Sequence, residues 1–146
     1  MKTSANGIRL IEQFEGFRAN RYRDSVGVLT IGFGTTAADI GTVPATCTRQ
    51  QAEKWLKDHL ASKYEPAVNG LRVPLNQNQF DALVSLVYNC GPGAMQWQIG
   101  RDLRAHNYKA ASADFPRYVY AGGHVIQGLV NRRAAERRLF DTPIHK

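Results

Sequence analysis

Apolar residues near the start of the chain recur every three positions, which is the spacing of one face of a helix. This first face consists of Ile8, Ile11 and Phe14. Ser4 or Asn6 can cap such a helix at its N-terminus, and Gly16 follows the last periodic residue. Because glycine commonly ends helices, we predict that the first helix stops near Gly16.

The pattern changes between Tyr22 and Gly41, where β-branched and aromatic residues dominate and glycines interrupt them. The residues concerned are Tyr22, Val26, Val28, Thr30, Ile31 and Phe33, with Gly27, Gly32 and Gly34. β-branched and aromatic residues favour strands, whereas glycines favour tight turns. We therefore predict a small, strongly turned sheet in this part of the chain.

Two capping boxes open the longer helical stretches. Thr48 with Gln51 opens a helix that is predicted to end around Pro66 or soon afterwards, and this helix could join two lobes. Asn76 with Gln79 opens a second helix, which is the best candidate for the core. Beyond residue 74 only helices are predicted, and the others lie at residues 101–106, 108–120 and 128–140.

The composition is that of an ordinary globular protein, with 146 residues of which 43% are hydrophobic and 21% are charged. A chain of this length can bury a core in one domain without a disulfide or metal scaffold. No apolar run approaches the roughly 20 residues that span a bilayer, and the first residues lack the apolar core of a signal peptide. We therefore expect that the protein is made in the cytoplasm and does not insert into a membrane. Cys47 and Cys90 are expected to be buried free thiols, with a disulfide between them as the alternative.

The formal charge of +7 favours polyanionic partners, such as nucleic acid or an anionic cell wall. Four arginines gather in the last predicted helix, namely Arg132, Arg133, Arg137 and Arg138. They could form a phosphate-binding face, but no helix-turn-helix, zinc or aromatic motif accompanies them. We therefore favour attraction to an anionic bacterial envelope over nucleic-acid binding. No metal site is expected either, because the histidines lack the spacing of metal ligands. The histidines are His59, His106, His124 and His145.

A possible acid–base pair is formed by Glu15, at the end of the first helix, and Asp24, which follows nine residues later in the turn-rich segment. A glycosidase needs one carboxylic acid that protonates the leaving oxygen and a second carboxylate that stays ionised on the other face of the sugar. Glu15 fits the first role and Asp24 the second. The hydroxyl of Thr30 could orient a water held by Asp24. By spacing alone this signal is weak, because an ordinary structural role is the more common one for each of the three residue types at such positions.

The residues around this trio resemble the signature of the phage-type lysozymes, glycoside hydrolase family 24. The matching strings are residues 14–18, 22–27 and 29–34. They contain a Glu-Gly pair, a Tyr-x-Asp and a Thr-Ile-Gly-x-Gly in the order of that family, with nine residues from Glu to Asp and six from Asp to Thr. The resemblance covers essentially the whole chain, because it continues through residues 72–83, 88–91 and 128–137.

The resemblance implies an α+β lysozyme-like fold, with a short antiparallel sheet in a small N-terminal lobe and a larger all-helical C-terminal lobe. Residues 1–146 would form one catalytic domain, with the N-terminal lobe at about 15–60 and the helical lobe at about 61–146. The first helix is expected to pack with the helical lobe. The cleft between the lobes would be closed by the helix after Thr48.

The implied activity is that of an endo-acting muramidase, which hydrolyses the β-1,4 bond between N-acetylmuramic acid and N-acetylglucosamine with inversion. Glu15 would be the general acid, and Asp24 and Thr30 would position the attacking water. Inversion requires the two carboxyl groups to lie roughly 6.5–9.5 Å apart. Arg132 matches the arginine that the family places against the catalytic glutamate, and a surface arginine is the alternative.

The resemblance implies substrate contacts at Thr36, Tyr88 and Gln98. Gln98 stands about where a serine of the family contacts substrate. Tyr88 is equally compatible with a core position, and the neighbouring Trp97 with either a stacking face for a sugar or a packing role. The chain departs from the family pattern at Thr35, which replaces the usual histidine.

The resemblance further implies a monomer that acts on peptidoglycan without a cofactor. The protein would accumulate in the host cytoplasm and depend on a holin to reach the wall. Two other hypotheses stay open. A lytic transglycosylase cuts the same bond but leaves an anhydro sugar, and a basic cell-wall-binding or membrane-disrupting module would need no carboxylate chemistry.

Overall fold

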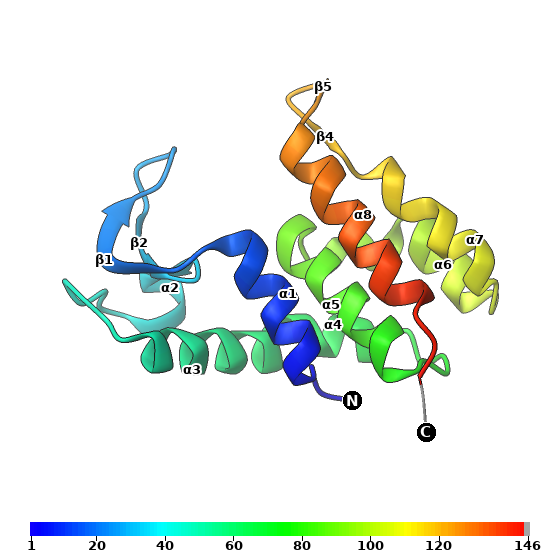
Figure 1. Ribbon diagram of the computed structural model, residues 1–146, viewed down its shortest axis with the longest axis horizontal. Coiled ribbons are helices and arrows are strands. Elements are labelled where there is room, and N and C mark those ends of the chain that lie inside the picture. Colours follow the sequence, from blue (N-terminus) through cyan, green and yellow to red (C-terminus); the bar gives the residue numbers. More distant parts are fainter. Residues whose placement is uncertain (145–146) are drawn as a thin grey trace.

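The computed structural model describes residues 1–144 and combines small antiparallel sheets with a larger set of helices. Figure 1 shows the larger sheet at one end of the molecule and most helices at the other, with α3 (Arg49–His59) running between them. The α+β fold class predicted from the sequence is confirmed. None of the described helices is long and apolar enough to cross a membrane.

Helix α1 (Ala5–Glu15) begins after Ser4 and ends at Gly16, as predicted. Gly16 has a φ of 75°, which glycine adopts without strain. The Ser4 hydroxyl does not cap the helix but donates to the carboxylate of Asp81 in α5 (Gln77–Cys90), and the Ser4 N–H donates to the same group at 3.0 Å. These bonds fix α1 on the central helix.

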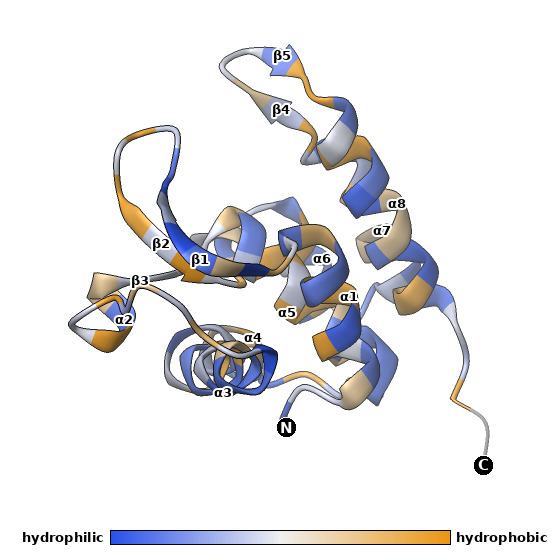
Figure 2. Ribbon diagram, turned by 60° about the vertical axis from the view of Figure 1, so that its left-hand side comes forward, coloured by the Kyte–Doolittle hydropathy of each residue, from blue (hydrophilic) through white to orange (hydrophobic). Residues whose placement is uncertain are grey.

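The larger sheet has three antiparallel strands in the order β1–β2–β3. They are β1 (Arg18–Arg23), β2 (Leu29–Gly32) and β3 (Thr35–Thr36). β1 starts before the predicted position Tyr22. Its first residues are exposed and mostly polar, so they carry no apolar signal that would predict a strand. β2, by contrast, buries Thr30 and Ile31. Figure 2 shows this difference as a hydrophilic β1 beside a more hydrophobic β2.

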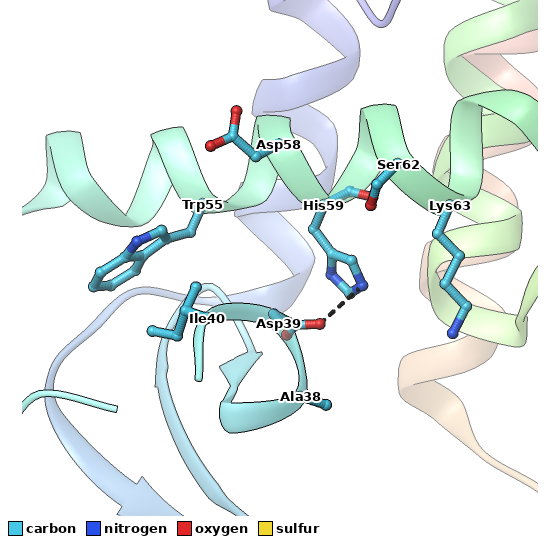
Figure 3. A pocket seen from close by; sticks show the side chains of 8 residues that line it. All are labelled: Ala38, Asp39, Ile40, Trp55, Asp58, His59, Ser62 and Lys63. Carbon is cyan, nitrogen blue, oxygen red and sulfur yellow. Dashed lines mark hydrogen bonds and ion pairs between the residues drawn. The ribbon is translucent and has the colours of Figure 1, made fainter. Parts of the chain in front are cut away.

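Helix α2 (Ala37–Ile40) directly follows the sheet, and the sequence pattern does not predict it. Thr36 and Asp39 form a capping box in which the Thr36 N–H donates to Asp39 Oδ2 at 2.8 Å. None of the four residues of α2 is buried. The helix lies against α3, where Asp39 contacts His59 (Figure 3).

Helix α3 begins with the predicted capping box of Thr48 and Gln51. It continues through a wider π-helical turn, η1 (Leu60–Tyr64), into α4 (Glu65–Asn69). Pro66 falls in the first turn of α4, where its missing N–H is tolerated. The helical stretch therefore ends soon after the proline, as predicted.

The core is centred on α5, which starts with the predicted capping box of Asn76 and Gln79. Helices α1, α4 and α8 (Gln127–Asp141) pack around it. Its fully buried apolar residues are Phe80, Ala82, Leu83, Val84, Leu86 and Val87. The prediction that this helix forms the core is confirmed.

The remaining helical elements are η2 (Pro92–Gln96), α6 (Gln98–Arg104), α7 (Tyr108–Asp114) and η3 (Phe115–Arg117). The predicted helix at 108–120 is wrong beyond residue 114, because Pro116 cannot donate to an α-helical ladder. The chain instead forms a hairpin of β4 (Tyr120–Ala121) and β5 (His124–Val125). The two glycines between these strands have φ of 58° and 79°, as a tight hairpin turn requires. The expectation of helices alone beyond residue 74 fails at this hairpin.

Both cysteines are free thiols, as predicted, and no disulfide joins Cys47 to Cys90. The expected burial is wrong in degree, because both residues are only half-buried. Desolvation nevertheless raises the pKa of each thiol above its ordinary value.

Candidate active site

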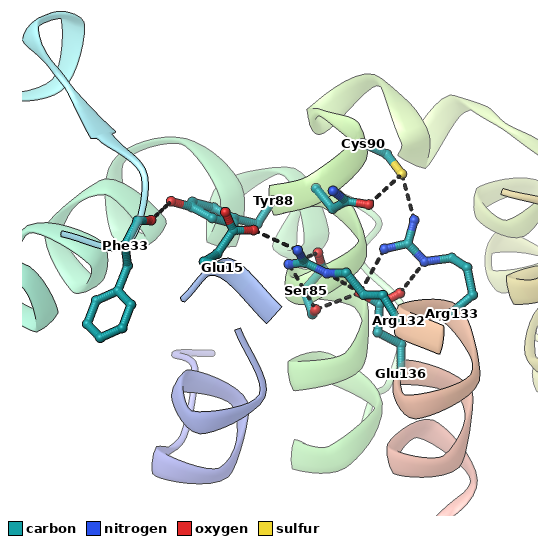
Figure 4. Close-up of polar contacts among 9 residues, drawn as sticks. Glu15, Phe33, Ser85, Tyr88, Cys90, Arg132, Arg133 and Glu136 are labelled. Atoms are coloured by element: carbon teal, nitrogen blue, oxygen red, sulfur yellow. Dashed lines mark hydrogen bonds and ion pairs between the residues drawn. The ribbon is translucent and has the colours of Figure 1, made fainter. Parts of the chain in front are cut away.

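Glu15 is the last residue of α1, and its side chain is 22% exposed. Its Oε2 accepts a hydrogen bond from Arg132 Nη1 at 2.6 Å, across 117 positions of the chain. Figure 4 shows Arg132 reaching Glu15 from α8. The structure thus decides between the two interpretations of this arginine: it contacts Glu15 and is not a surface residue.

A buried network fixes Arg132. Its Nε donates to Glu136 Oε2 at 3.3 Å, and its Nη2 lies 3.4 Å from both oxygens of Ser85. Glu136 is fully buried, accepts from the Ser85 hydroxyl at 2.6 Å and contacts Arg133 Nε at 2.6 Å (Figure 4). Burial raises the pKa of Glu136, and the two guanidinium groups oppose this shift. The network therefore presents Arg132 to Glu15 in one fixed orientation.

The cluster of four arginines is consequently not one basic surface. Arg132 and Arg133 are 4% and 1% exposed, and their charges are matched by Glu15 and Glu136. Only Arg137 and Arg138 remain near the surface of α8. A phosphate-binding face made of all four arginines is ruled out.

A pocket of about 350 Å³ lies beside Glu15. Its lining residues come from α1, the sheet, α2, the α3–η1 helix and α5, and they are Glu15, Gly34, Thr36, Ala38, Asp39, His59, Lys63, Tyr64 and Tyr88. Two predicted substrate-contact residues, Thr36 and Tyr88, are therefore brought to the same pocket as Glu15. The pocket forms where the sheet meets the helices.

Tyr88 and Gly34 shape the wall next to the glutamate. The Tyr88 hydroxyl donates to the carbonyl of Phe33 at 3.0 Å, and its ring packs edge-on against Tyr64 with the centroids 5.0 Å apart. Burial, with a smaller effect of the Glu15 charge, raises the pKa of Tyr88. Gly34 has a φ of 89°, and a Cβ there would lie 3.4 Å from Glu15 Oε1. The backbone thus approaches the carboxyl group closely because this position has no side chain.

Asp24 lies in the β1–β2 turn and Thr30 in β2. Asp24 Oδ1 accepts from the N–H groups of Val26 and Val28, at 3.0 Å and 2.8 Å. The buried Thr30 hydroxyl donates to the carbonyl of the same Val28 at 2.9 Å. The structure therefore ties Asp24 and Thr30 to one backbone segment. Neither residue is among those that line the pocket beside Glu15.

Gln98, the third predicted substrate contact, is not brought to this pocket. It is the exposed first residue of α6, and its amide donates to Asp102 Oδ1 at 3.1 Å in the same helix. Its neighbour Trp97 packs on Tyr118, with ring centroids 4.8 Å apart, and lines a different pocket. The contact of Gln98 with substrate therefore stays a prediction, made from a position outside the Glu15 pocket.

Sequence reasoning missed Asp39, His59 and Lys63 as pocket residues. Thr35, which replaces the family histidine, is buried. The histidine at this pocket is instead His59, whose Nε2 lies 3.0 Å from Asp39 Oδ1. No local signal marks this pair, because its members are 20 positions apart and lie on two helices.

No group of three histidine, cysteine, aspartate or glutamate side chains within residues 1–144 could hold a metal ion. The fourth histidine, His145, lies outside the described residues.

The chain is similar in sequence to a family of known proteins. The sequence model of the phage lysozyme family matches residues 12–136. The endolysin of Salmonella phage P22 is 41% identical over 145 residues, which cover 96% of this chain and 98% of that protein. The endolysin of Lactococcus phage c2 is 42% identical over 99% of this chain but only 62% of its own length. The chain thus spans less than two thirds of the Lactococcus phage protein.

The fold of the chain is also similar to solved structures. A mutant of P22 lysozyme superposes with a TM-score of 0.88 at 39% identity, covering 97% of this chain and 99% of that one. The muramidase domain of SpmX from Asticaccaulis excentricus superposes with a TM-score of 0.87 at 34% identity, with the same coverage. With a family match over most of its length and relatives of about 40% identity, this chain belongs to the phage lysozyme family.

Proposed function

We propose that the protein is an endolysin, a muramidase that hydrolyses the β-1,4 bond between N-acetylmuramic acid and N-acetylglucosamine in bacterial peptidoglycan. The observation that carries this proposal is the half-buried Glu15, held at the pocket by the buried Arg132. Relatives named endolysin and muramidase domain support it.

Glu15 is the general acid in this proposal. Because Arg132 binds Oε2, the rotation of the carboxyl group is fixed and Oε1 is left on the side of Gly34 and the pocket. An acid in this position can deliver its proton to the oxygen of a glycosidic bond bound there. Thr36 and Tyr88 would contact the sugar rings.

Asp24 and Thr30 position the attacking water. Asp24 Oδ1 is occupied by the two N–H groups of its turn, so Oδ2 is the oxygen that would accept a proton from the water. The Thr30 hydroxyl donates to Val28 and can still accept a hydrogen bond through its second lone pair. Attack on the face opposite Glu15 gives inversion, for which the two carboxyl groups must be separated by roughly 6.5–9.5 Å.

The residues of both lobes are needed for this chemistry, so we propose that the sheet region of about 15–60 and the helical region beyond it act as one catalytic domain. The formal charge of +7 would attract the enzyme to the anionic envelope. Nucleic acid is not a partner in this proposal, because two of the four clustered arginines are buried in ion pairs.

The test compares wild type with Glu15→Gln on Gram-negative cells whose outer membrane has been permeabilised. We expect wild type to clear the suspension and Glu15→Gln to lose nearly all activity. Glu12→Gln is the matched control, because Glu12 lies one turn earlier in α1 and outside the pocket. Equal lysis by Glu15→Gln would overturn the proposal and favour a basic module that acts without carboxylate chemistry.

Mass spectrometry of the released fragments separates the two enzyme mechanisms. A hydrolase leaves reducing muramic ends, whereas a lytic transglycosylase leaves anhydro ends that are lighter by one water. NMR of fresh products then reports the anomer, and the α-anomer from a β-linked substrate would establish inversion.

We also propose that the enzyme is monomeric, is made in the host cytoplasm and reaches the wall after a holin has opened the membrane. Inducing the protein in a Gram-negative host should give little lysis until chloroform permeabilises the inner membrane. Rapid lysis without the chloroform would contradict holin dependence. Sedimentation of the purified protein should give the mass of one chain.

A further inference from the structure

Each of the two carboxylate oxygens of Asp39 makes a polar contact with another residue. Oδ2 accepts from the N–H of Thr36 at 2.8 Å and from its hydroxyl at 3.3 Å. Oδ1 faces Nε2 of His59 at 3.0 Å, and the two side chains are only 13% and 20% exposed. In Figure 3, the His59 ring points from α3 directly at Asp39 in α2. Asp39 therefore connects Thr36, at the rim of the Glu15 pocket, to the long helix.

Asp39 and His59 also lie between two pockets. A pocket of about 490 Å³ lies between α2 and the α3–η1 helix, next to Trp55 and Ile40. Asp39 and His59 line this pocket and also the pocket of about 350 Å³ that contains Glu15. The Asp39–His59 contact is thus part of the wall between the two pockets.

Aromatic packing holds His59 in place from its other side. Its ring packs edge-on against Tyr64 and Tyr88, with centroids 5.0 Å and 6.1 Å away. Tyr88 in turn holds the carbonyl of Phe33 at 3.0 Å. The segment from Phe33 to Thr36 is therefore anchored at both ends, by Tyr88 at its start and by the Asp39–His59 pair at its end.

The second anchor matters because α2 has little else to hold it. None of the residues of α2 is buried, and the strand before it, β3, has only two residues. Apolar burial therefore contributes little to the position of α2. Glu15, by contrast, is held by Arg132 from α8 and does not depend on α2.

We infer that Asp39 and His59 are positioning residues, which hold Thr36 and the α2 wall at the distance from α3 that a sugar chain needs. The inference rests on the proposed muramidase function. It predicts that loss of the contact weakens substrate binding while the chemistry at Glu15 continues. KM should rise about tenfold, the order of effect expected for losing one partly buried polar contact to a carboxylate, and kcat should change less than about twofold.

The experiment measures kcat and KM separately on soluble, uncross-linked peptidoglycan chains. His59→Leu removes the donor and should raise KM. His59→Gln should restore a KM close to that of wild type, because the Gln amide places an N–H donor near the position of the histidine Nε2. Asp39→Asn should raise KM to an intermediate value, because Thr36 and His59 contact different carboxylate oxygens and the substitution replaces one of these oxygens by an NH2 group.

Asp58→Asn is the matched control. Asp58 precedes His59 in α3 and lines the larger pocket, but its exposed carboxylate pairs with Lys54. This variant should leave kcat and KM unchanged. Thermal unfolding of all variants is recorded alongside, because a merely structural contact would lower the melting temperature without the split between KM and kcat.

Three outcomes decide the inference. A raised KM in His59→Leu that is rescued in His59→Gln supports positioning. Provided that wild type is active, the inference is overturned by an unchanged KM in His59→Leu or by an equal rise of KM in both His59 variants. If His59→Leu fails to fold, Asp39→Asn against Asp58→Asn gives the same decision. Inactive wild type would instead refute the proposed function, and the two failures are therefore distinguishable.

Discussion

The sheet region and the helical region of this protein hold their residues in different ways. In the sheet region, β1 is almost wholly exposed, and Asp24 is fixed by the N–H groups of its own turn. In the helical region, α5 is buried on nearly every side, and even its Ser85 is fully buried with Glu136 as partner. A substitution in the exposed β1–β2 turn should therefore change the chemistry with little loss of stability, whereas one in the buried helical network should change stability first.

The sharpest test of this difference is Asp24→Asn. The Asn oxygen can still accept from the N–H groups of Val26 and Val28, so the turn should persist, but the negative charge is lost. Activity should fall by about 10²- to 10⁴-fold, the usual range for losing a general base. The melting temperature should stay close to that of wild type. Rates on permeabilised cells and thermal unfolding test both statements.

Ser25→Ala in the same turn is the control for Asp24→Asn, and it should match wild type in both measurements. A large fall in melting temperature for Asp24→Asn would mean that the charge supports the fold of the sheet region. The separation between chemistry and stability would then not hold.

The reverse case is Glu136→Gln in the helical region. Removing this buried charge leaves the guanidinium groups of Arg132 and Arg133 without their shared partner. Breaking a buried ion pair on one side typically costs about 3–5 kcal/mol, so the melting temperature should fall by roughly 10 °C. Glu53→Gln is the control, because its contact with Lys57 at 3.8 Å is exposed and should contribute less than about 1 kcal/mol. Equal melting temperatures for the two variants would contradict a stabilising network.

A smaller effect is expected from Gly34→Ala compared with Gly41→Ala. Both glycines have a positive φ, 89° and 83°, which strains any other residue, so alanine should lower the unfolding free energy at each. Only at Gly34 would the new Cβ face the site, 3.4 Å from Glu15 Oε1. Activity per folded molecule should therefore fall in Gly34→Ala alone. Equal activity in the two variants would show that the carboxyl group tolerates a methyl neighbour.

Local signals explain what the sequence predicted well. The capping boxes at Thr48 and Asn76 were confirmed because a capping box needs only four consecutive residues. The hairpin at Gly122 and Gly123 has an equally local signal, but the pattern of residues 108–120 favours a helix, and this helix cannot continue past Pro116.

Long-range contacts could not be predicted from pattern alone. The approach of Arg132 to Glu15 was expected only from the family resemblance, since 117 positions separate the two residues. The pairing of Asp39 with His59 has no signal at all, because it depends on how α2 packs against α3. The position of Gln98 outside the Glu15 pocket could not be foreseen either, because the sequence does not give the direction of α6.

The smallest effect concerns Asp114, a buried carboxyl group at the end of α7. Desolvation, with a contribution from Asp102, raises its pKa from the ordinary value of 3.8 to about 6, although Arg117 opposes the shift. The folded state therefore binds this proton more tightly than the unfolded state. The resulting stabilisation is complete below about pH 4 and is lost as the pH rises through 6.

Asp114→Asn should remove this pH dependence. At pH 7 the neutral amide avoids the desolvation cost of a buried carboxylate, and its N–H can donate to Asp102. The variant should therefore be more stable than wild type by on the order of 1 kcal/mol. At pH 4 the two proteins should unfold at nearly the same temperature. Thermal unfolding at pH 4, 5, 6 and 7 measures the difference. A constant gap across this range would show that the carboxyl group of Asp114 does not titrate there, and a less stable variant at pH 7 would mean that its bond to Arg117, at 2.9 Å, outweighs the cost of burial.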